Sequence, residues 1–506
     1  MLRLQPTSAV LQLSRLTIAA SLPASCRKMS TADGTMRPPQ SRAADAPEEV
    51  KHQPELKPAH AFLFPLGYKD AAYQWWTSLA PQVVERNLLS LMPHLKEAND
   101  SITNIDTPER PDPYGTRVWR RTMVQLSGKN RALNEVSVER VGEETEDALV
   151  MIHGYGAGLG FFYKNFEPIS RMKGLKIYAL DMLGMGNSTR PPFKIHAKLK
   201  EDQVLEAESW FIDALEEWRK ARKLEQFTLL GHSLGGYLAV SYAIKYPGRL
   251  KKLILASPVG IPVNPYAVNA SMPDPNTSTI ENEFTQDQES TTEPSGELSK
   301  HKPASNVLRR PLPSWFTWLW DQNISPFSIV RMSGPLGPRF VSGWSYRRFN
   351  HLPQLESQAL HDYSFSIFKQ RGSGEYALAY ILAPGAFARR PVIDRIQDVG
   401  RQSLPQPEGA PAKKETGIPI VFMYGEKDWM DVAGGFASEE KLKQVKLQAL
   451  LHGTEDEKRN ENGSTKVLLV PKAGHHLYLD NPDEFNDMIR KELEETRENE
   501  RRQPGL

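Results

Sequence analysis

The chain shows a regular series of short apolar runs separated by stretches with helical spacing. Between the earlier runs, residues 201–222 and 236–246 place their apolar side chains at the spacing of helices. Short apolar strands that alternate with helices are typical of a mostly parallel sheet covered by helices on both faces. We therefore expect an α/β fold, with two further strands within residues 115–140. The predicted strands of the parallel sheet are residues 148–152, 176–180, 227–231, 252–256, 418–423 and 466–470.

This alternation stops between residues 260 and 416. Residues 268–306 consist mainly of Ser, Thr, Pro, Asn, Asp and Glu, and we expect them to be disordered because they cannot bury enough apolar surface to fold. Residues 310–396 carry helical patterns and many aromatic side chains. Since ligands of open sheets bind beyond the carboxyl ends of the strands, the insertion at residues 261–400 is expected to form a helical cap over that edge.

The segment before the predicted sheet is apolar and aromatic. Residues 83–96 have the pattern of an amphipathic helix that leads into the core. Trp75 and Trp76 fit either a lipid interface, which indole rings favour, or a helix packed on the main domain. The chain then divides into a leader at residues 1–32, a linker at 33–58, the first part of the core at 60–260, the cap at 261–400, the second part of the core at 417–495 and a charged tail at 496–506.

The leader has a biased composition. Residues 1–32 contain four basic residues, many Ser and Thr, and no acidic residue. This composition is typical of a mitochondrial transit peptide, so we expect a mitochondrial protein. A secretory signal is the main alternative, although Gln12, Ser14 and Arg15 interrupt its apolar stretch. A second alternative is that residues 1–32 form a disordered tail whose composition is accidental.

Overall composition narrows the functional classes. The 506-residue chain has a formal net charge of +2, which gives no electrostatic reason to expect a nucleic-acid partner. Its single cysteine, Cys26, excludes an internal disulfide framework and a Cys-based metal site. The sequence contains no run of 18 apolar residues, so we expect no transmembrane helix and only peripheral contact with a membrane surface.

The segment GHSLGG at residues 231–236 is the strongest chemical motif. It fits G-x-S-x-G with Gly231, Ser233 and Gly235, and it lies between a predicted strand and a predicted helix. Small residues beside the serine permit the sharp strand-to-helix turn that exposes a nucleophile. The alternative is a tight turn that carries a serine by chance. The strand and helix on either side favour the catalytic interpretation.

A serine nucleophile needs a histidine base and an acid that orients it, in the order Ser, Asp or Glu, His for this architecture. Asp428 follows the predicted strand at 418–423, and Asp431 is the alternative acid. His475 follows the last predicted strand, and the small residues before it favour it over His476. We therefore expect a catalytic triad of Ser233, Asp428 and His475.

The loop HGYGAGLG supplies candidate donors for an oxyanion. Gly154 and Gly156 permit a sharp turn that aims the Tyr155 amide beside the amide of Leu234. A glycine-rich loop after a strand also suggests a phosphate cradle, but the glycine spacing matches neither phosphate motif and no Lys-Ser/Thr pair follows. We expect an oxyanion hole, with no metal or organic cofactor.

With these residues assembled, the chain resembles the α/β-hydrolase superfamily, and most closely its lipid-acting branch. The segments that carry the resemblance are GHSLGGYLAVSYAIKYPGRLKKLIL, DMLGMGNSTRP, RMSGPLGPRF, FARRPVIDRI and GHHLYLDNPDEFN. The branch includes N-acyl-phospholipid lysophospholipases, the coactivator of triglyceride lipase and fungal mitochondrial cardiolipin-specific deacylases. The resemblance covers roughly residues 70–495 without the low-complexity inserts.

The resemblance implies an anionic phospholipid substrate. With the leader, it favours a cardiolipin deacylase that is peripheral on the mitochondrial inner membrane and yields monolysocardiolipin. In this branch His475 and Asp480 also form the H-x4-D box associated with acyl transfer to lysophosphatidic acid. A CoA-dependent acyltransferase and a non-catalytic lipid-surface adaptor therefore remain alternatives. Arginines of the cap, such as Arg331 and Arg339, are candidates for phosphate contacts, although solvated surface charge explains most of them.

Overall fold

A single sheet of nine strands organises the described part of the chain. The computed structural model describes residues 64–98, 112–263, 323, 325–383, 387–406, 409 and 412–502. The leader, the linker at 33–58 and the insert at 268–306 lie outside the described residues.

Most of the sheet is parallel, as predicted. The strand order is β1-β2-β3-β5-β4-β6-β7-β8-β9, and the strands from β5 to β9 in this order are parallel to their neighbours. The expected pair within 115–140 forms an antiparallel hairpin at one side. The strands are β1 (Lys96–Glu97), β2 (Arg117–Gln125), β3 (Ala132–Arg140), β4 (Asp147–Ile152), β5 (Leu175–Leu180), β6 (Phe227–His232), β7 (Leu250–Ala256), β8 (Pro419–Gly425) and β9 (Ser464–Val470).

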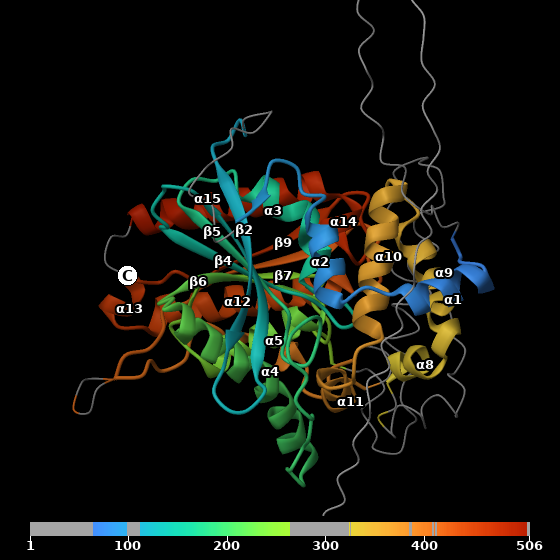
Figure 1. Cartoon of the computed structure of the whole chain (residues 1–506). Helices are drawn as coiled ribbons and strands as arrows, with labels where there is room; N and C mark the ends of the chain where they lie inside the picture. The colour runs from blue at the N-terminus through green and yellow to red at the C-terminus, as the bar shows by residue number, and fades with distance from the viewer. Residues whose placement is uncertain are drawn as a thin grey trace, which may run out of the picture. The chain divides into compact units, whose positions relative to one another are not determined.

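Helices cover both faces of the sheet (Figure 1). On one face lie α3 (Tyr163–Ile169) and α15 (Pro482–Arg502), which contact each other. On the other lie α4 (Lys200–Arg222), α5 (Leu234–Lys245) and α12 (Val432–His452). The predicted α/β fold class is therefore confirmed.

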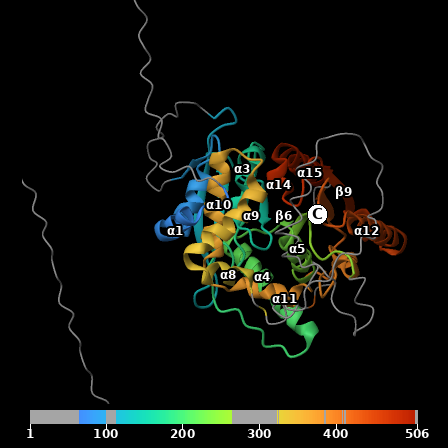
Figure 2. The ribbon, with the colours of Figure 1, turned by 90° about the vertical axis from the view of Figure 1, so that its right-hand side faces the viewer.

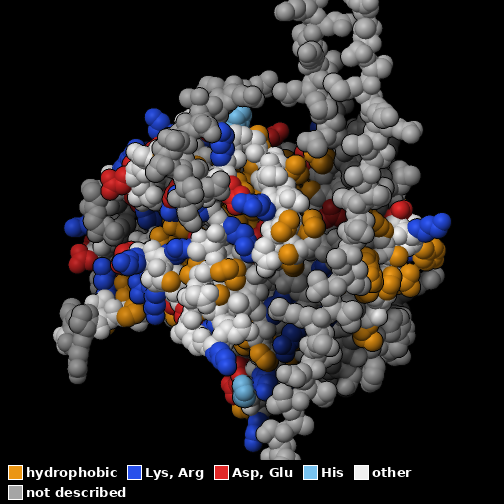
Figure 3. Space-filling model, in the orientation of Figure 1, with side chains coloured by type: hydrophobic (Ala, Val, Ile, Leu, Met, Phe, Trp, Pro, Cys, Tyr) orange, Lys and Arg blue, Asp and Glu red, His pale blue; other side chains and the backbone are white. Residues whose placement is uncertain are grey.

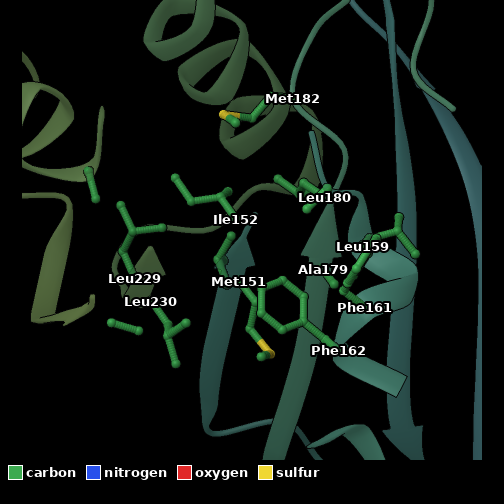
Figure 4. Close-up of a cluster of buried hydrophobic side chains, with 14 of the residues drawn as sticks. Met151, Ile152, Leu159, Phe161, Phe162, Ala179, Leu180, Met182, Leu229 and Leu230 are labelled. Atoms are coloured by element: carbon green, nitrogen blue, oxygen red, sulfur yellow. The ribbon is translucent and has the colours of Figure 1, made fainter. Parts of the chain in front are cut away.

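The central strands carry apolar side chains on both faces because both are covered. Strand β6 is buried at every residue, and β4 at every residue after Asp147. A 3-10 turn, η1 (Leu159–Phe162), brings Leu159, Phe161 and Phe162 against these strands (Figure 4). The strands that lead to the reactive loops are thus held in an apolar core.

A helical insertion separates β7 from β8, as expected for a cap. Helices α9 and α10 lie side by side (Figure 2), and α8 packs on α9. The described elements of this insertion are α8 (Pro326–Met332), η3 (Gly334–Leu336), α9 (Gly337–Phe349), α10 (Gln354–Phe368), η4 (Gly374–Ala377), α11 (Leu378–Ile381), η5 (Val392–Asp394) and η6 (Ile396–Asp398).

The lead-in segment forms two helices that pack on this cap. Helix α1 (Tyr68–Thr77) contacts α9 and η3, and α2 (Pro81–Leu89) contacts α10. The prediction of one helix over 83–96 was therefore wrong in its extent. The chain leaves the helix at Leu89 and reaches β1 through a turn that contains Pro93, whose missing N–H cannot continue a helix.

The end of the chain also differs from expectation. Residues 496–502, expected to belong to a charged tail, are the last turns of α15. Arg497 forms an ion pair with Asp147 at 2.8 Å, and Glu500 pairs with Lys251 of β7 at 2.9 Å. These ion pairs hold the charged end of the helix against the sheet. Two short helices near this end, α13 (Glu455–Arg459) and α14 (Leu477–Asp480), complete the described core.

None of the helices in the described part of the chain has both the length and the apolarity to cross a bilayer.

A buried glutamate joins the lead-in helix, the sheet and the cap. Glu85 of α2 is fully buried and accepts hydrogen bonds from Arg121 of β2, Asn134 of β3 and Asn187. Tyr363 of α10 also donates to it, at 3.3 Å. Burial, followed by the charge of nearby Asp181, raises the pKa of Glu85 to about 7.

This raised pKa predicts that stability falls as pH rises from about 5 to about 7. In that range folded Glu85 keeps a proton that the unfolded chain has lost, so the unfolded chain binds fewer protons. The rise in the pKa of Glu85 from 4.5 to about 7 corresponds to a loss of unfolding free energy on the order of 3 kcal/mol. Glu85→Gln should flatten the profile of unfolding free energy against pH, measured by chemical denaturation. The exposed Glu201→Gln is the control, and equal slopes in wild type and Glu85→Gln would contradict the assignment.

Candidate active site

Ser233 lies on the sharp turn between β6 and α5. Its φ of 52° and ψ of −116° are rarely adopted by a side-chain-bearing residue, and they aim the chain abruptly from strand to helix. A Cβ on Gly231 would lie 2.5 Å from the Gly235 carbonyl oxygen, and a Cβ on Gly235 would lie 2.7 Å from the His153 oxygen. Only glycine fits at these two positions, which explains the motif around the serine.

His475 and Asp428 meet beside this turn. Asp428 follows β8, His475 follows β9, and Nδ1 of the histidine lies 3.2 Å from Oδ1 of the aspartate. Both side chains are buried, at 0% and 1% exposure. The Asp428 carboxylate also accepts from the Met430 amide at 3.0 Å and from the Ser257 hydroxyl. The hydrogen bonds from these donors offset the free-energy cost of removing the charged carboxylate from water.

The two alternative residues have other positions. Asp431 is exposed and is the N-cap of α12, where its side chain accepts from the Ala433 amide at 2.8 Å. His476 is buried and lies with its ring centroid 6.0 Å from Phe161. The carboxylate that contacts His475 is therefore that of Asp428.

His232, the residue before the serine, ties the serine turn to the histidine loop. Its Nε2 donates to the His475 carbonyl oxygen at 2.9 Å, and the two rings lie 4.9 Å apart. Burial, followed by the charge of His475, holds the pKa of His232 well below its usual value. His232 is thus a neutral donor that fixes the backbone of His475 next to Ser233.

The glycine-rich loop passes directly over the serine. A Cβ on Gly154 would lie 2.9 Å from the Ser233 Cβ, and Gly156 has a φ of 70°. Tyr155 between them is buried and stacks on Phe327 of the cap, with ring centroids 5.3 Å apart. Leu234 is the first residue of α5, where an amide has no acceptor within the helix.

His153 orients this loop. Its Nδ1 donates to the Gly154 carbonyl at 2.7 Å, and its Nε2 accepts from the Met182 amide at 3.2 Å. These roles require the neutral ring, and burial lowers the pKa of His153 to about 4. The loop is therefore held in one conformation at neutral pH.

Asp480 of the H-x4-D box supports the histidine loop from α14. Its Oδ2 accepts from the Gly474 amide at 2.9 Å, and its Oδ1 lies 3.8 Å from Nε2 of His351 in the cap. Gly474 precedes His475, so this carboxylate anchors the turn that carries the histidine.

The cap arginines are mostly engaged within the protein. Arg331 pairs with Glu375 at 2.7 Å and Arg390 with Glu208 at 3.2 Å. Arg339 donates to a main-chain carbonyl and stacks on Tyr68. Arg389 donates to the Ala379 carbonyl, and Arg395 pairs with Glu208 at 3.2 Å.

Several supporting residues were not singled out from the sequence. Ser257, His153 and His232 contact the site through segments distant in the chain. His153 and His232 stand inside the quoted motifs HGYG and GHSLGG, so their position next to the reactive turns was the available signal. Ser257 follows β7 with a φ of 45°, which the sequence does not reveal.

Comparisons with known proteins identify the family of the chain. Residues 147–482 match the sequence model of the alpha/beta hydrolase fold. The chain is 32% identical over 385 residues to a probable 1-acylglycerol-3-phosphate O-acyltransferase of Oryza sativa subsp. japonica, covering 74% of this chain and 73% of that protein. It is 28% identical to the (Lyso)-N-acylphosphatidylethanolamine lipase of Homo sapiens, covering 70% and 82%. It is also 28% identical to the 1-acylglycerol-3-phosphate O-acyltransferase ABHD5 of Mus musculus, covering 79% and 88%.

The names of these relatives denote proteins that act on lipids, as the sequence resemblance implied. The family match spans the strands and loops that carry Ser233, Asp428 and His475. The chain belongs to the α/β-hydrolase fold family, among relatives that act on lipids.

Proposed function

We propose that the protein is a serine acyl-ester hydrolase that acts on phospholipid. The observation that carries the proposal is the buried His475–Asp428 pair, tied through His232 to the turn that presents Ser233. In this site the carboxylate holds the imidazole with Nδ1 protonated, so Nε2 is the basic nitrogen. A strained serine, a buried base and a glycine loop over the serine are the parts that acyl transfer needs.

The reaction proceeds in two steps. Ser233 Oγ attacks the acyl carbonyl carbon while His475 accepts its proton, and the Tyr155 and Leu234 amides stabilise the oxyanion. The tetrahedral intermediate collapses, the ester C–O bond breaks, and His475 returns the proton to the leaving lysophospholipid. Water then attacks the acyl carbonyl carbon while His475 accepts a proton from it. The bond to Ser233 Oγ breaks, His475 returns the proton to this oxygen, and the fatty acid is released.

Cardiolipin is the proposed substrate, with monolysocardiolipin as the product. The likeness to cardiolipin deacylases in the motifs and the transit-like leader at 1–32 support this choice. The lipase name of the human relative supports hydrolysis of a phospholipid acyl group more generally.

Acyl transfer to lysophosphatidic acid is the second candidate function. Two of the relatives above are named 1-acylglycerol-3-phosphate O-acyltransferases, which favours it. The same acyl-serine serves both reactions, because a lysophospholipid hydroxyl can replace water as the acceptor when acyl-CoA is the donor. Asp480 does not separate the two, since its contact with the Gly474 amide supports His475 in either case. A non-catalytic adaptor is the third candidate, and the intact site speaks against it.

The first prediction of the proposed function concerns the lipid products. Wild-type protein mixed with cardiolipin vesicles should release monolysocardiolipin and fatty acid without acyl-CoA, and Ser233→Ala should release neither above background. Mass spectrometry of the lipids measures both. Product only in the presence of acyl-CoA and lysophosphatidic acid would assign acyl transfer, and equal activity of Ser233→Ala would overturn the site.

The second prediction compares the two aspartates of the β8–α12 loop. Asp428→Asn removes the charge that orients His475 and should lower kcat on a soluble short-chain ester by about 10³–10⁴-fold. Asp431→Asn removes an equal charge but keeps a good N-cap, so kcat should stay within about threefold of wild type. Steady-state kinetics measures both. The reverse order of effects would show that the acid is misassigned.

The third prediction concerns the proposed mitochondrial location. A fluorescent protein fused to residues 1–58 should enter mitochondria, whereas a fusion to residues 33–58 should stay in the cytosol, because only the first carries the basic, acid-free leader. Microscopy with protease protection measures import. Cytosolic fluorescence from both fusions would contradict the location.

A further inference from the structure

Exposed apolar side chains are concentrated on the lead-in and cap helices. Of the 22 large apolar residues exposed in the described part of the chain, 12 lie within residues 68–83 and 329–355. The most exposed are Met332 at 85% and Trp76 at 81%. The 12 residues are Tyr68, Tyr73, Trp75, Trp76, Leu79, Val83, Ile329, Met332, Leu336, Phe340, Tyr346 and Leu355, and we call them the apolar face.

The elements that carry the apolar face are packed together. Helix α1 contacts both η3 and α9, and α8 contacts both as well. In Figure 3, apolar side chains gather at the right-hand edge, where Figure 1 shows α1 and α9. Soluble monomers rarely expose apolar surface in one large patch, and such patches mark interaction sites.

Helix α1 is held rigidly with its aromatic side chains outward. Its buried Gln74 donates to Asp362 of α10 at 2.7 Å and contacts Nε2 of His361 at 3.0 Å. These contacts fix one side of the helix on the cap. Trp76 therefore stays exposed because the opposite side of α1 is anchored.

Cations outnumber carboxylates along the cap part of the apolar face. Residues 325–355 contain four arginines and no Asp or Glu, although Arg331 pairs with Glu375 and Arg348 is buried. Lys369, at the rim of a groove of about 330 Å³ between α1, α2 and α10, donates to Ser78 at 2.7 Å. Within the described ranges no carboxylate forms an ion pair with this lysine, and apolar side chains such as Leu91 and Phe365 line the groove beside it.

We propose that the apolar face is the surface by which the protein docks on an anionic phospholipid bilayer. Aromatic residues with apolar bodies, exposed aliphatic side chains and surrounding cations are the features that favour the lipid–water boundary over a protein partner. The choice of phospholipid rests on the proposed function, and docking deepens it by bringing the cap to the substrate. Tyr155 beside Ser233 stacks on Phe327 of α8, so the docked helices adjoin the reactive site.

Vesicle flotation tests the docking surface. Full-length Ser233→Ala protein, which leaves the lipid intact, is mixed with phosphatidylcholine vesicles with and without cardiolipin. The double variant Trp76→Ser and Met332→Ser is compared with Leu447→Ser and Leu451→Ser on α12, which are 54% and 58% exposed. We expect the face variant to partition at least about tenfold less onto cardiolipin vesicles, and the α12 variant to partition like the parent.

The outcomes separate docking from catalysis. The same substitutions in protein that keeps Ser233 should leave hydrolysis of a soluble short-chain ester unchanged, because both positions lie outside the reactive loops. Flotation of the face variant equal to its parent, equal loss in the α12 variant, or absence of flotation by the parent would each overturn the proposal. Absence of ester hydrolysis in all proteins would count against the proposed function and not against the docking surface.

Discussion

The contact between the buried imidazole of His475 and the buried carboxylate of Asp428 requires that the surrounding structure supply hydrogen-bond donors. An ionised carboxylate removed from water is costly unless several donors surround it. Asp428 has three such donors, from His475, the Met430 amide and the Ser257 hydroxyl. Each comes from a loop that leaves a parallel strand at the same edge of the sheet, so the parallel topology is what brings the donors together.

The neighbouring histidines show a second constraint. His153 and His232 are buried and neutral, and each uses one ring nitrogen to fix the backbone of a reactive loop. If either ring were protonated on both nitrogens at neutral pH, its positive charge would oppose the positive charge that His475 acquires in the proposed reaction. Burial thus gives these rings a positioning role and leaves His475 beside the carboxylate as the ring suited to proton transfer.

A separate polar network connects the site to the surface. Glu85 joins the lead-in helix α2, the hairpin and the cap helix α10 through hydrogen bonds. The same network includes Asp181, which accepts from the amide of Leu159 in the glycine-rich loop. Cap, loop and lead-in are therefore fixed by one set of buried hydrogen bonds.

Local patterns were sufficient to predict the strands, the turn at Ser233 and the order of Ser233, Asp428 and His475, because each depends on neighbouring residues and on the fixed direction of parallel strands. The Glu85 network, the role of Ser257 and the bond from His232 to His475 depend on segments 36 to more than 200 residues apart, which no local pattern reveals. The extension of α15 was missed for the same reason, since ion pairs to distant strands hold it. The end of α2 was missed although Pro93, four residues further on, is a local signal.

The most direct test of the account is to map the residue modified by a serine-directed fluorophosphonate. We predict one adduct per chain, located by peptide mass spectrometry on Ser233, and strongly slowed labelling in a His475→Ala variant that still folds. Labelling at another residue, or no labelling of folded wild-type protein, would contradict the claim that Ser233 is an activated nucleophile.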